Sequence, residues 1–211
     1  GLALNIKSHV CWHVYGLLYR SERAYNDAIK CYQNAIRIDP TNNEILKDLS
    51  LLQIQRRMTE GFAETRRKIL MLKTNNRNNW IALALGHHLS GKFKQAVGVI
   101  DAFNKTIDAK SRETKTYEHS EMLLYKNMIL EESGDLEGAL KHLNEIKPEV
   151  MDELHWLERS AALNLALKHS DVAEKEYRAL LKINSENYNY HNGLASALGI
   201  TSSPSSPRAA S

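Results

Sequence analysis

The feature that most constrains this chain is the return of similar residues every 34 positions. Trp12 and Trp80 lie two such periods apart with Leu46 midway, and Ala28 and Ala96 repeat the same interval. A period of about 20 to 50 residues is typical of repeat proteins, in which each unit buries its apolar face against its neighbours. The sequence therefore predicts a stack of similar units.

Within the first unit, apolar residues recur at three- and four-residue intervals, the spacing of one face of an α-helix. Two stripes follow one another: Trp12, Gly16 and Tyr19, then Ala28, Tyr32 and Ala35. The small residues let two helices approach closely, and the aromatic rings fill the space around them. Period and residues are those of the tetratricopeptide repeat. We therefore predict an all-α tetratricopeptide-repeat superhelix, an α-solenoid of antiparallel helix pairs.

The 34-residue period divides the first half of the chain into three units, at about 9–42, 43–76 and 77–110. Pro40 lies in the connector after the first unit. Thr41 and Glu44 then have the spacing of a capping box at the start of the next helix. The third unit carries the expected residues Trp80, Ala84 and Ala96.

The period is interrupted once and then resumes. Ala139 follows Ala96 by 43 residues, so nine extra residues enter, which we place between Asn104 and His119. Ala173 follows Ala139 by 34 again. This predicts units at about 120–153 and 154–187 and a partial unit at 188–198, all in one solenoid domain that spans residues 1–200.

The end of the chain has a different composition. Residues 201–211 read TSSPSSPRAAS, and Ser, Pro and Ala offer little to bury, so we predict a disordered tail. No apolar run approaches the length that spans a membrane. Cys11 and Cys31 are the only cysteines, and we interpret them as reduced, packed thiols of a cytosolic protein rather than as a disulfide.

Catalytic patterns are missing from the sequence. There is no GxSxG elbow, no Walker loop and no GxGxxG. His9 and His13 stand one helical turn apart and would suit zinc, but Cys11 between them points elsewhere and no HExxH follows. A packed or solvated histidine pair is therefore the favoured interpretation. We predict no catalytic residue, no metal and no cofactor.

Positive charge is concentrated between residues 56 and 77. The chain has a net charge of +3, whereas this segment holds seven cations against only Glu60 and Glu64, so the remainder is slightly negative. The seven are Arg56, Arg57, Arg66, Arg67, Lys68, Lys73 and Arg77. They form a candidate contact for ribosomal RNA, since phosphates attract such patches without regard to sequence. An ordinary solvated face of Arg and Lys explains the same residues without a ligand.

Stacked helix pairs without chemical motifs favour a scaffold or peptide-binding module. One kind of tetratricopeptide protein grips a chaperone's terminal carboxylate with Lys, Asn and Arg at fixed positions of the first helices. Those positions here hold His13, Leu17, Asp48, Asn78 and Ala82. A carboxylate clamp of that kind is therefore not expected.

Several segments go beyond the repeat consensus. HVCWHVYGLL, DLSLLQIQ, GFAETRRKIL, NWIALALGHHL and YEHSEMLLYKNMILEESG include positions that the repeat leaves free. They closely resemble the large auxiliary subunit of the eukaryotic N-terminal acetyltransferase A complex. The resemblance covers roughly residues 2–198, is not seen in the tail from Thr201, and concerns only the early repeats of a much longer protein.

The resemblance implies a non-catalytic subunit that holds the small catalytic acetyltransferase and adapts it to the ribosome in the cytosol. Its partners would be that catalytic subunit and the ribosome, with no membrane and no small-molecule substrate of its own. An acetyl-CoA loop is not expected, since Gln95, Gly98 and Gly193 fall inside predicted helices. The alternative is a peptide-binding module unrelated to acetylation.

Overall fold

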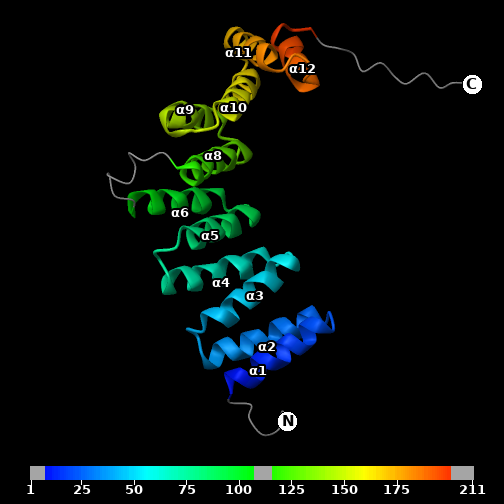
Figure 1. Cartoon of the computed structure of the whole chain (residues 1–211), viewed down its shortest axis with the longest axis vertical. Coiled ribbons are helices and arrows are strands. Elements are labelled where there is room, and N and C mark those ends of the chain that lie inside the picture. The colour runs from blue at the N-terminus through cyan, green and yellow to red at the C-terminus, as the bar shows by residue number, and fades with distance from the viewer. Residues whose placement is uncertain (1–7, 107–115, 201–211) are drawn as a thin grey trace, which may run out of the picture. The chain divides into compact units, whose positions relative to one another are not determined.

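The computed structural model describes residues 8–106 and 116–200. Within them all regular structure is helical and no β-strand occurs, which confirms the predicted all-α fold (Figure 1). The chain forms two compact units, Gly1–Asp108 (unit 1) and Ala109–Ser211 (unit 2). Their joining into one solenoid over residues 1–200 stays a prediction. The predicted tail, 201–211, and most of the predicted insertion lie outside the described residues.

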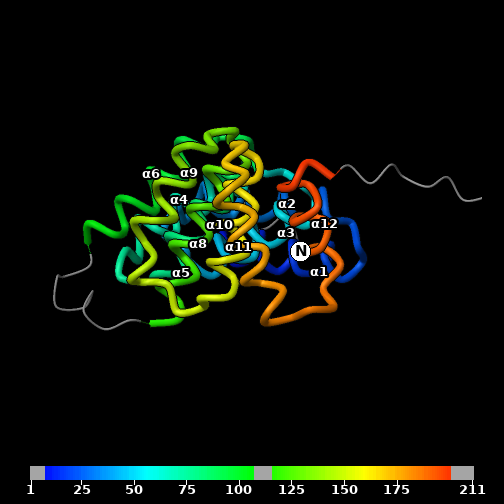
Figure 2. The backbone as a smooth tube through the Cα atoms, turned by 90° about the horizontal axis from the view of Figure 1, so that it is seen from above, coloured from blue at the N-terminus to red at the C-terminus, as the bar shows by residue number. Residues whose placement is uncertain are grey.

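Unit 1 consists of three antiparallel helix pairs, and the first and second helices of a pair are termed A and B. The pairs are α1 (His9–Ser21) with α2 (Tyr25–Ile38), α3 (Asn43–Gln55) with α4 (Thr59–Leu72), and α5 (Arg77–Leu89) with α6 (Phe93–Thr106). In Figure 1 the turns from A to B helices lie along one side of unit 1, and the turns from B to A helices lie along the other. The trace from above consists of the same helices and short turns (Figure 2).

Small residues bring the helices of a pair together. Ala28, Tyr32 and Ala35 of α2 are fully buried, and the Tyr32 ring lies directly against Gly16 of α1. Trp12 and Tyr19 are partly buried against the same cluster. In the third pair, Ala84 and Ala96 are fully buried, and the Trp80 indole donates to the Thr74 carbonyl at 2.8 Å. Pro40 is exposed in the connector after α2.

Side-chain caps start the A helices of unit 1 at 34-residue steps. Ser8, Asn42 and Asn76 each accept a backbone N–H of the first turn, as N-cap residues do. The capping box predicted at Thr41 is therefore wrong, because Asn42 is the cap and Thr41 bonds Asp39 instead. Asn42 accepts the Ile45 N–H, one residue after the Glu44 N–H that a Thr41 cap would have accepted.

The turns from A to B helices share one backbone conformation. The last residue before the B-helix cap has a positive φ, and the next N–H bonds back to a carbonyl five residues earlier, as in a Schellman motif. The positive-φ residues are Arg23 (61°), Arg57 (56°), Gly91 (69°), Gly134 (86°) and Lys168 (62°). The first three are spaced by 34 residues, and so are the last two.

Unit 2 begins with a longer A helix and a shorter B helix. They are α8 (Tyr117–Glu132) and α9 (Leu136–Ile146), followed by a 3₁₀ turn, η2 (Lys147–Glu149), that contains Pro148. Then come α10 (Glu153–Ala166), α11 (Ser170–Ile183) and α12 (Tyr188–Ala197). Ala139 and Ala173 are fully buried, and α8 starts three residues before the predicted boundary at 120.

Candidate interaction surfaces

The structure divides the predicted basic segment between two ends of a helix pair. Arg56 and Arg57 occupy the turn between α3 and α4, whereas Lys73 follows the far end of α4 and Arg77 begins α5. Because α4 has 14 residues, about 20 Å of helix separates the two groups. The seven cations therefore do not form a single patch.

Arg66, in the middle of α4, belongs to the interior more than to the surface. Its guanidinium lies 5.1 Å from the centre of the Phe62 ring, which is a cation–π distance. Its Nε is buried without a hydrogen-bond partner, and burial lowers the pKa of the group. The long side chain thus covers Phe62, which stands where the other units have alanine.

Arg67 and Lys68 are exposed on α4. Lys68 lies 3.5 Å from Glu64 one turn earlier, an exposed pair of small energetic value. Burial, and then the positive charges of Arg67 and Lys92, lower the pKa of His87 in α5. Arg67 therefore acts electrostatically on the neighbouring helix pair.

A second group of cations lies where the A helices of unit 1 turn into the B helices. Its members, hereafter the basic edge, are exposed and come from three successive turns: Arg23, Arg56, Arg57, Lys92 and Lys94. Lys92 pairs with Glu60 at 3.0 Å. The charge count did not find Arg23, which lies outside residues 56–77, but the 34-residue step back from Arg57 reaches it.

A small polar cavity of about 200 Å³ lies on the basic edge. It is lined by Arg23, Ala24, Tyr25, Asn26 and Asp27 from the start of α2 and by Arg56 from the next turn. α2 starts at Tyr25, and its N-cap residue Ala24 has no side chain that could accept a hydrogen bond from the backbone N–H groups of the first turn. The Asp27 carboxylate is paired with Lys30 at 3.1 Å.

The A helices of the first two pairs are linked through charged groups. His13 and Arg20 of α1 lie 3.1 and 3.5 Å from the Asp48 carboxylate of α3. His13 and Asp48 stand at carboxylate-clamp positions and lie 3.1 Å from each other. Apolar side chains remain exposed beside them, namely Val10, Val14 and Leu17 on α1 and Leu51 on α3.

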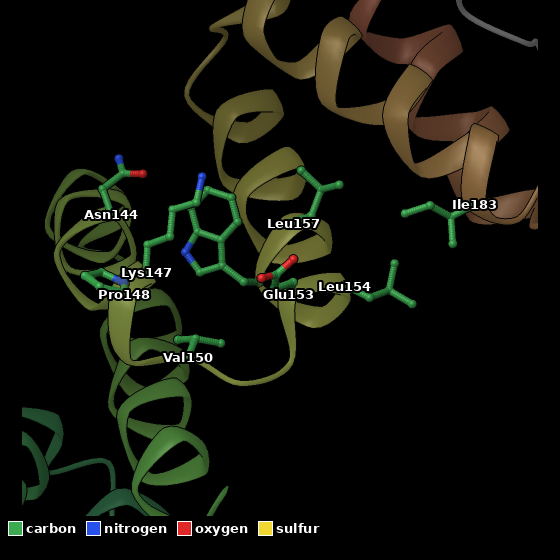
Figure 3. Close-up of a pocket in the computed structure, with 9 residues that line it drawn as sticks. Asn144, Lys147, Pro148, Val150, Glu153, Leu154, Leu157 and Ile183 are labelled. Atoms are coloured by element: carbon green, nitrogen blue, oxygen red, sulfur yellow. The ribbon is translucent and has the colours of Figure 1, made fainter. Parts of the chain in front are cut away.

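Unit 2 contains a groove of about 870 Å³ where α9 ends early (Figure 3). Apolar side chains form most of its walls: Pro148, Val150, Leu154, Trp156, Leu157 and Ile183. The Lys147 ammonium stacks on Trp156 at 4.1 Å, and the indole N–H donates to the Leu143 carbonyl at 2.8 Å. The Lys147 ammonium and the Trp156 indole N–H therefore both have partners within the chain.

The histidines of α1 each face an acid rather than each other. His9 lies 4.0 Å from Asp39 and His13 lies beside Asp48. In residues 8–106 and 116–200, no three His, Cys, Asp or Glu side chains gather closely enough to hold a metal ion. Cys11 and Cys31 are both free thiols, and burial raises the pKa of Cys31. Among the helices of the described ranges, none has the length and hydropathy needed to cross a bilayer.

Comparison with known proteins gives two family matches. The family model for the auxiliary subunit of N-terminal acetyltransferase A matches residues 117–210, and a tetratricopeptide-repeat model matches residues 16–53. The first match reaches residue 210, so the prediction that the resemblance stops before the tail is wrong.

Similar proteins and structures extend this result. The chain is 49% identical to the N-terminal acetyltransferase A complex auxiliary subunit NAA15 of Arabidopsis thaliana over 96% of its own length. It is 40% identical to human N-alpha-acetyltransferase 16, NatA auxiliary subunit, over 95%. It spans about a quarter of each relative, 23%. In the structure of Naa15/Naa10 bound to HypK-THB, one chain is 40% identical with a TM-score of 0.87, covering 95% of this chain and 30% of that one.

Antiparallel helix pairs with this period and these packing residues define a tetratricopeptide-repeat protein. The protein named MamA, at 14% identity and a TM-score of 0.59, shares the fold alone. Sequence identity of 40 to 49% to NatA auxiliary subunits, along almost the whole chain, defines the family more narrowly than the fold does. The chain belongs to the family of auxiliary subunits of N-terminal acetyltransferase A.

Proposed function

We propose that this chain is part of a non-catalytic subunit that supports co-translational acetylation of protein N-termini in the cytosol. The observation that carries the proposal is its 40 to 49% identity to auxiliary subunits over 95 to 96% of its length. Because the chain spans 23% of those relatives, the proposal concerns the role of these repeats within a longer assembly.

The proposed role leaves the chemistry to a partner. Gln95 and Gly98 lie inside α6 and Gly193 lies inside α12, so their amide groups belong to helices and cannot form an acetyl-CoA loop. Purified chain mixed with acetyl-CoA and a peptide that begins with Ser is expected to give no acetylated product. Turnover that follows the chain through purification would overturn the non-catalytic role.

The proposed protein partner is the catalytic acetyltransferase subunit. Support comes from the similar chain in the structure whose name pairs Naa15 with Naa10. Tagged chain is expected to retain the small acetyltransferase from a cytosolic extract. Retention of unrelated apolar peptides instead of that subunit would favour the alternative function, a peptide-binding module. The exposed Val14, Leu17 and Leu51 on the A helices are the observation that favours this alternative.

The second proposed partner is the ribosome, through the cations of residues 56–77. Arg56, Arg57, Arg67 and Lys68 are exposed, whereas Arg66 covers Phe62. Replacing the four exposed residues by Glu is expected to reduce co-sedimentation with ribosomes while leaving the Arg66 packing intact. Unchanged co-sedimentation would remove this segment from the proposed contact.

A further inference from the structure

We infer that Thr59, in the turn from α3 to α4, is a phosphorylation site for protein kinases that select basic residues. The phosphate cancels the positive charge of Arg56 and Arg57, the two arginines before it, and so regulates what this turn binds. The regulatory part of the inference rests on the proposed ribosome contact, whereas the assignment of the site does not.

The residues before Thr59 have the charge pattern that such kinases recognise. Arg56 and Arg57 precede the threonine by three and two positions. Kinases distinguish substrates by the charges around the hydroxyl group, and one large class selects arginine at both of these positions. In the full sequence, no other serine or threonine has arginine at both. The pattern therefore selects one hydroxyl group in the chain.

The structure leaves this motif accessible. Arg56 and Arg57 are exposed, and Met58 is 41% exposed. Thr59 is the first residue of α4, and it is partly exposed. Both the charges that a kinase reads and the hydroxyl that it modifies therefore lie at the surface of unit 1.

The start of α4 is also easy to open locally. Its N-cap residue, Met58, makes no side-chain hydrogen bond to the first turn. Opening that turn breaks the bond from the Phe62 N–H to the Met58 carbonyl, 2.9 Å long, and the exposed pair of Lys92 and Glu60. Helix ends fray at little cost, and exposed ion pairs contribute little to stability. A kinase therefore reaches the threonine without unfolding the helix pair.

Unit 2 contains an equivalent turn that lacks the motif. Ser170 is the first residue of α11, and its N-cap residue, His169, makes no side-chain cap either. Lys168 has a positive φ, as Arg57 does. Leu167 stands where the first arginine of the motif would be. Because Ser170 is exposed, the two hydroxyl groups share a backbone setting and differ in the charges before them.

The modification is a phosphoryl transfer from ATP. The Thr59 Oγ1 forms a bond to the γ-phosphorus while the bond from that phosphorus to the bridging oxygen breaks. ADP leaves, and the hydroxyl proton passes to a carboxylate of the kinase. The product carries a charge of about −2 at pH 7, which matches the combined charge of Arg56 and Arg57. Since helix N-termini stabilise phosphate, the start of α4 can hold the group without losing its helical form.

The first experiment treats the purified chain with ATP, Mg²⁺ and the catalytic subunit of cyclic AMP-dependent protein kinase, which belongs to this class. Mass spectrometry of proteolytic peptides measures the phosphate at each hydroxyl group. Thr59 is expected to become phosphorylated, with Ser170 below about a tenth of its level. Arg57→Gly keeps the hydroxyl and suits the positive φ of the turn, and it is expected to slow phosphorylation of Thr59 about tenfold or more.

A synthetic peptide of residues 52–64 is the control for access. Phosphorylation of the peptide but not of the folded chain would show that the turn shields Thr59. Failure of both would show that the kinase does not select this motif, and equal phosphate on Ser170 would show that the arginines do not direct it. Each of these results would overturn the assignment.

The second experiment compares phosphorylated and untreated chain in co-sedimentation with ribosomes between about 50 and about 200 mM salt. Loss of two positive charges is expected to weaken binding about tenfold and to make the salt slope smaller by about two. Thr59→Ala, treated with the same kinase, is expected to sediment like untreated chain. Equal sedimentation of phosphorylated and untreated chain would overturn the regulatory role.

The two experiments separate this inference from the proposed function. Untreated chain that does not sediment with ribosomes would refute the ribosome contact and its regulation, while the site is still decided by mass spectrometry alone. Circular dichroism of the phosphorylated chain is expected to show an unchanged helical spectrum and a melting point at or above that of untreated chain. A lower melting point would show that the phosphate disrupts α4, and it would overturn regulation through charge.

Discussion

The aromatic ring of Tyr32 occupies the place where a side chain on Gly16 would be. A Cβ atom added to Gly16 would lie 2.2 Å from Cε1 of that ring. The same relationship occurs in unit 2, where a Cβ on Gly193 would lie 2.2 Å from Cζ of Tyr177. In each unit, a helix without a side chain at one position lets a tyrosine ring fill the space between two helices.

This contact predicts the effect of Gly16→Ala. The methyl group forces the Tyr32 ring or the helix backbone to move, and overpacking of this kind typically costs about 1 to 3 kcal/mol of unfolding free energy. Urea unfolding followed by circular dichroism measures the change. Gly98→Ala is the control, because Gly98 lies in α6 with open space around it, and it is expected to add up to about 1 kcal/mol. Equal effects of the two changes would contradict the packing role of Gly16.

The left-handed turns predict that Arg57→Gly stabilises the chain. Glycine adopts a φ of 56° without the steric cost that arginine carries, so a gain of about 0.5 to 1 kcal/mol is expected. Thermal unfolding would show a higher midpoint. The reverse change, Gly91→Ala, is expected to destabilise by about 1 kcal/mol, because the conformational cost then enters at an equivalent turn. A destabilised Arg57→Gly protein would mean that the arginine stabilises the fold.

The cap of α3 predicts a contrast between neighbouring residues. Asn42→Ala removes the acceptor for the Ile45 N–H and is expected to cost about 1 kcal/mol. Thr41→Ala breaks only an exposed contact with Asp39 and is expected to change stability by less than about 0.5 kcal/mol. Chemical denaturation of both variants tests which residue caps the helix. The opposite order would restore the capping box that the sequence suggested.

Alkaline pH is expected to destabilise unit 2 through Tyr125. Burial, and then the Glu132 carboxylate, raise the pKa of this phenol to about 12 from a usual value of 10.0. The folded chain therefore retains the phenolic proton at pH values where the unfolded chain loses it, so stability falls as pH rises from 10 to 12. Urea unfolding at several pH values in this range tests the direction. Tyr125→Phe has no proton to lose and should show a smaller fall.

Much of the fold follows from the sequence, because the repeat imposes its packing through a few small and aromatic residues. Gly16 and Ala28 can be recognised from spacing alone, since most helix pairs of this kind keep a small residue at these positions. The start of α8 is less predictable. Nine extra residues interrupt the 34-residue period between Ala96 and Ala139, so the period gives no position for the helix start, which Thr116 caps.

The candidate surfaces are harder to predict than the fold. A charge count along the chain groups Arg57 with Lys73, although the length of α4 separates them, and it treats Arg66 as a surface cation although the ring of Phe62 holds it. Counting charges at equivalent repeat positions would have paired Arg57 with Arg23. The groove near Trp156 follows no repeat position or motif in the sequence, and it is lined by residues from the end of α9, from η2, and from α10 and α11.

The turns between A and B helices have a consequence for how such a protein changes over time. Main-chain hydrogen bonds close each turn whatever side chain stands at the left-handed position, which holds glycine in two pairs and arginine or lysine in three. One codon per repeat therefore suffices to add or remove a cation at each of these turns, without changing the path of the backbone. The repeat supplies one left-handed turn position per helix pair, and the charges at these positions can evolve while the fold is preserved.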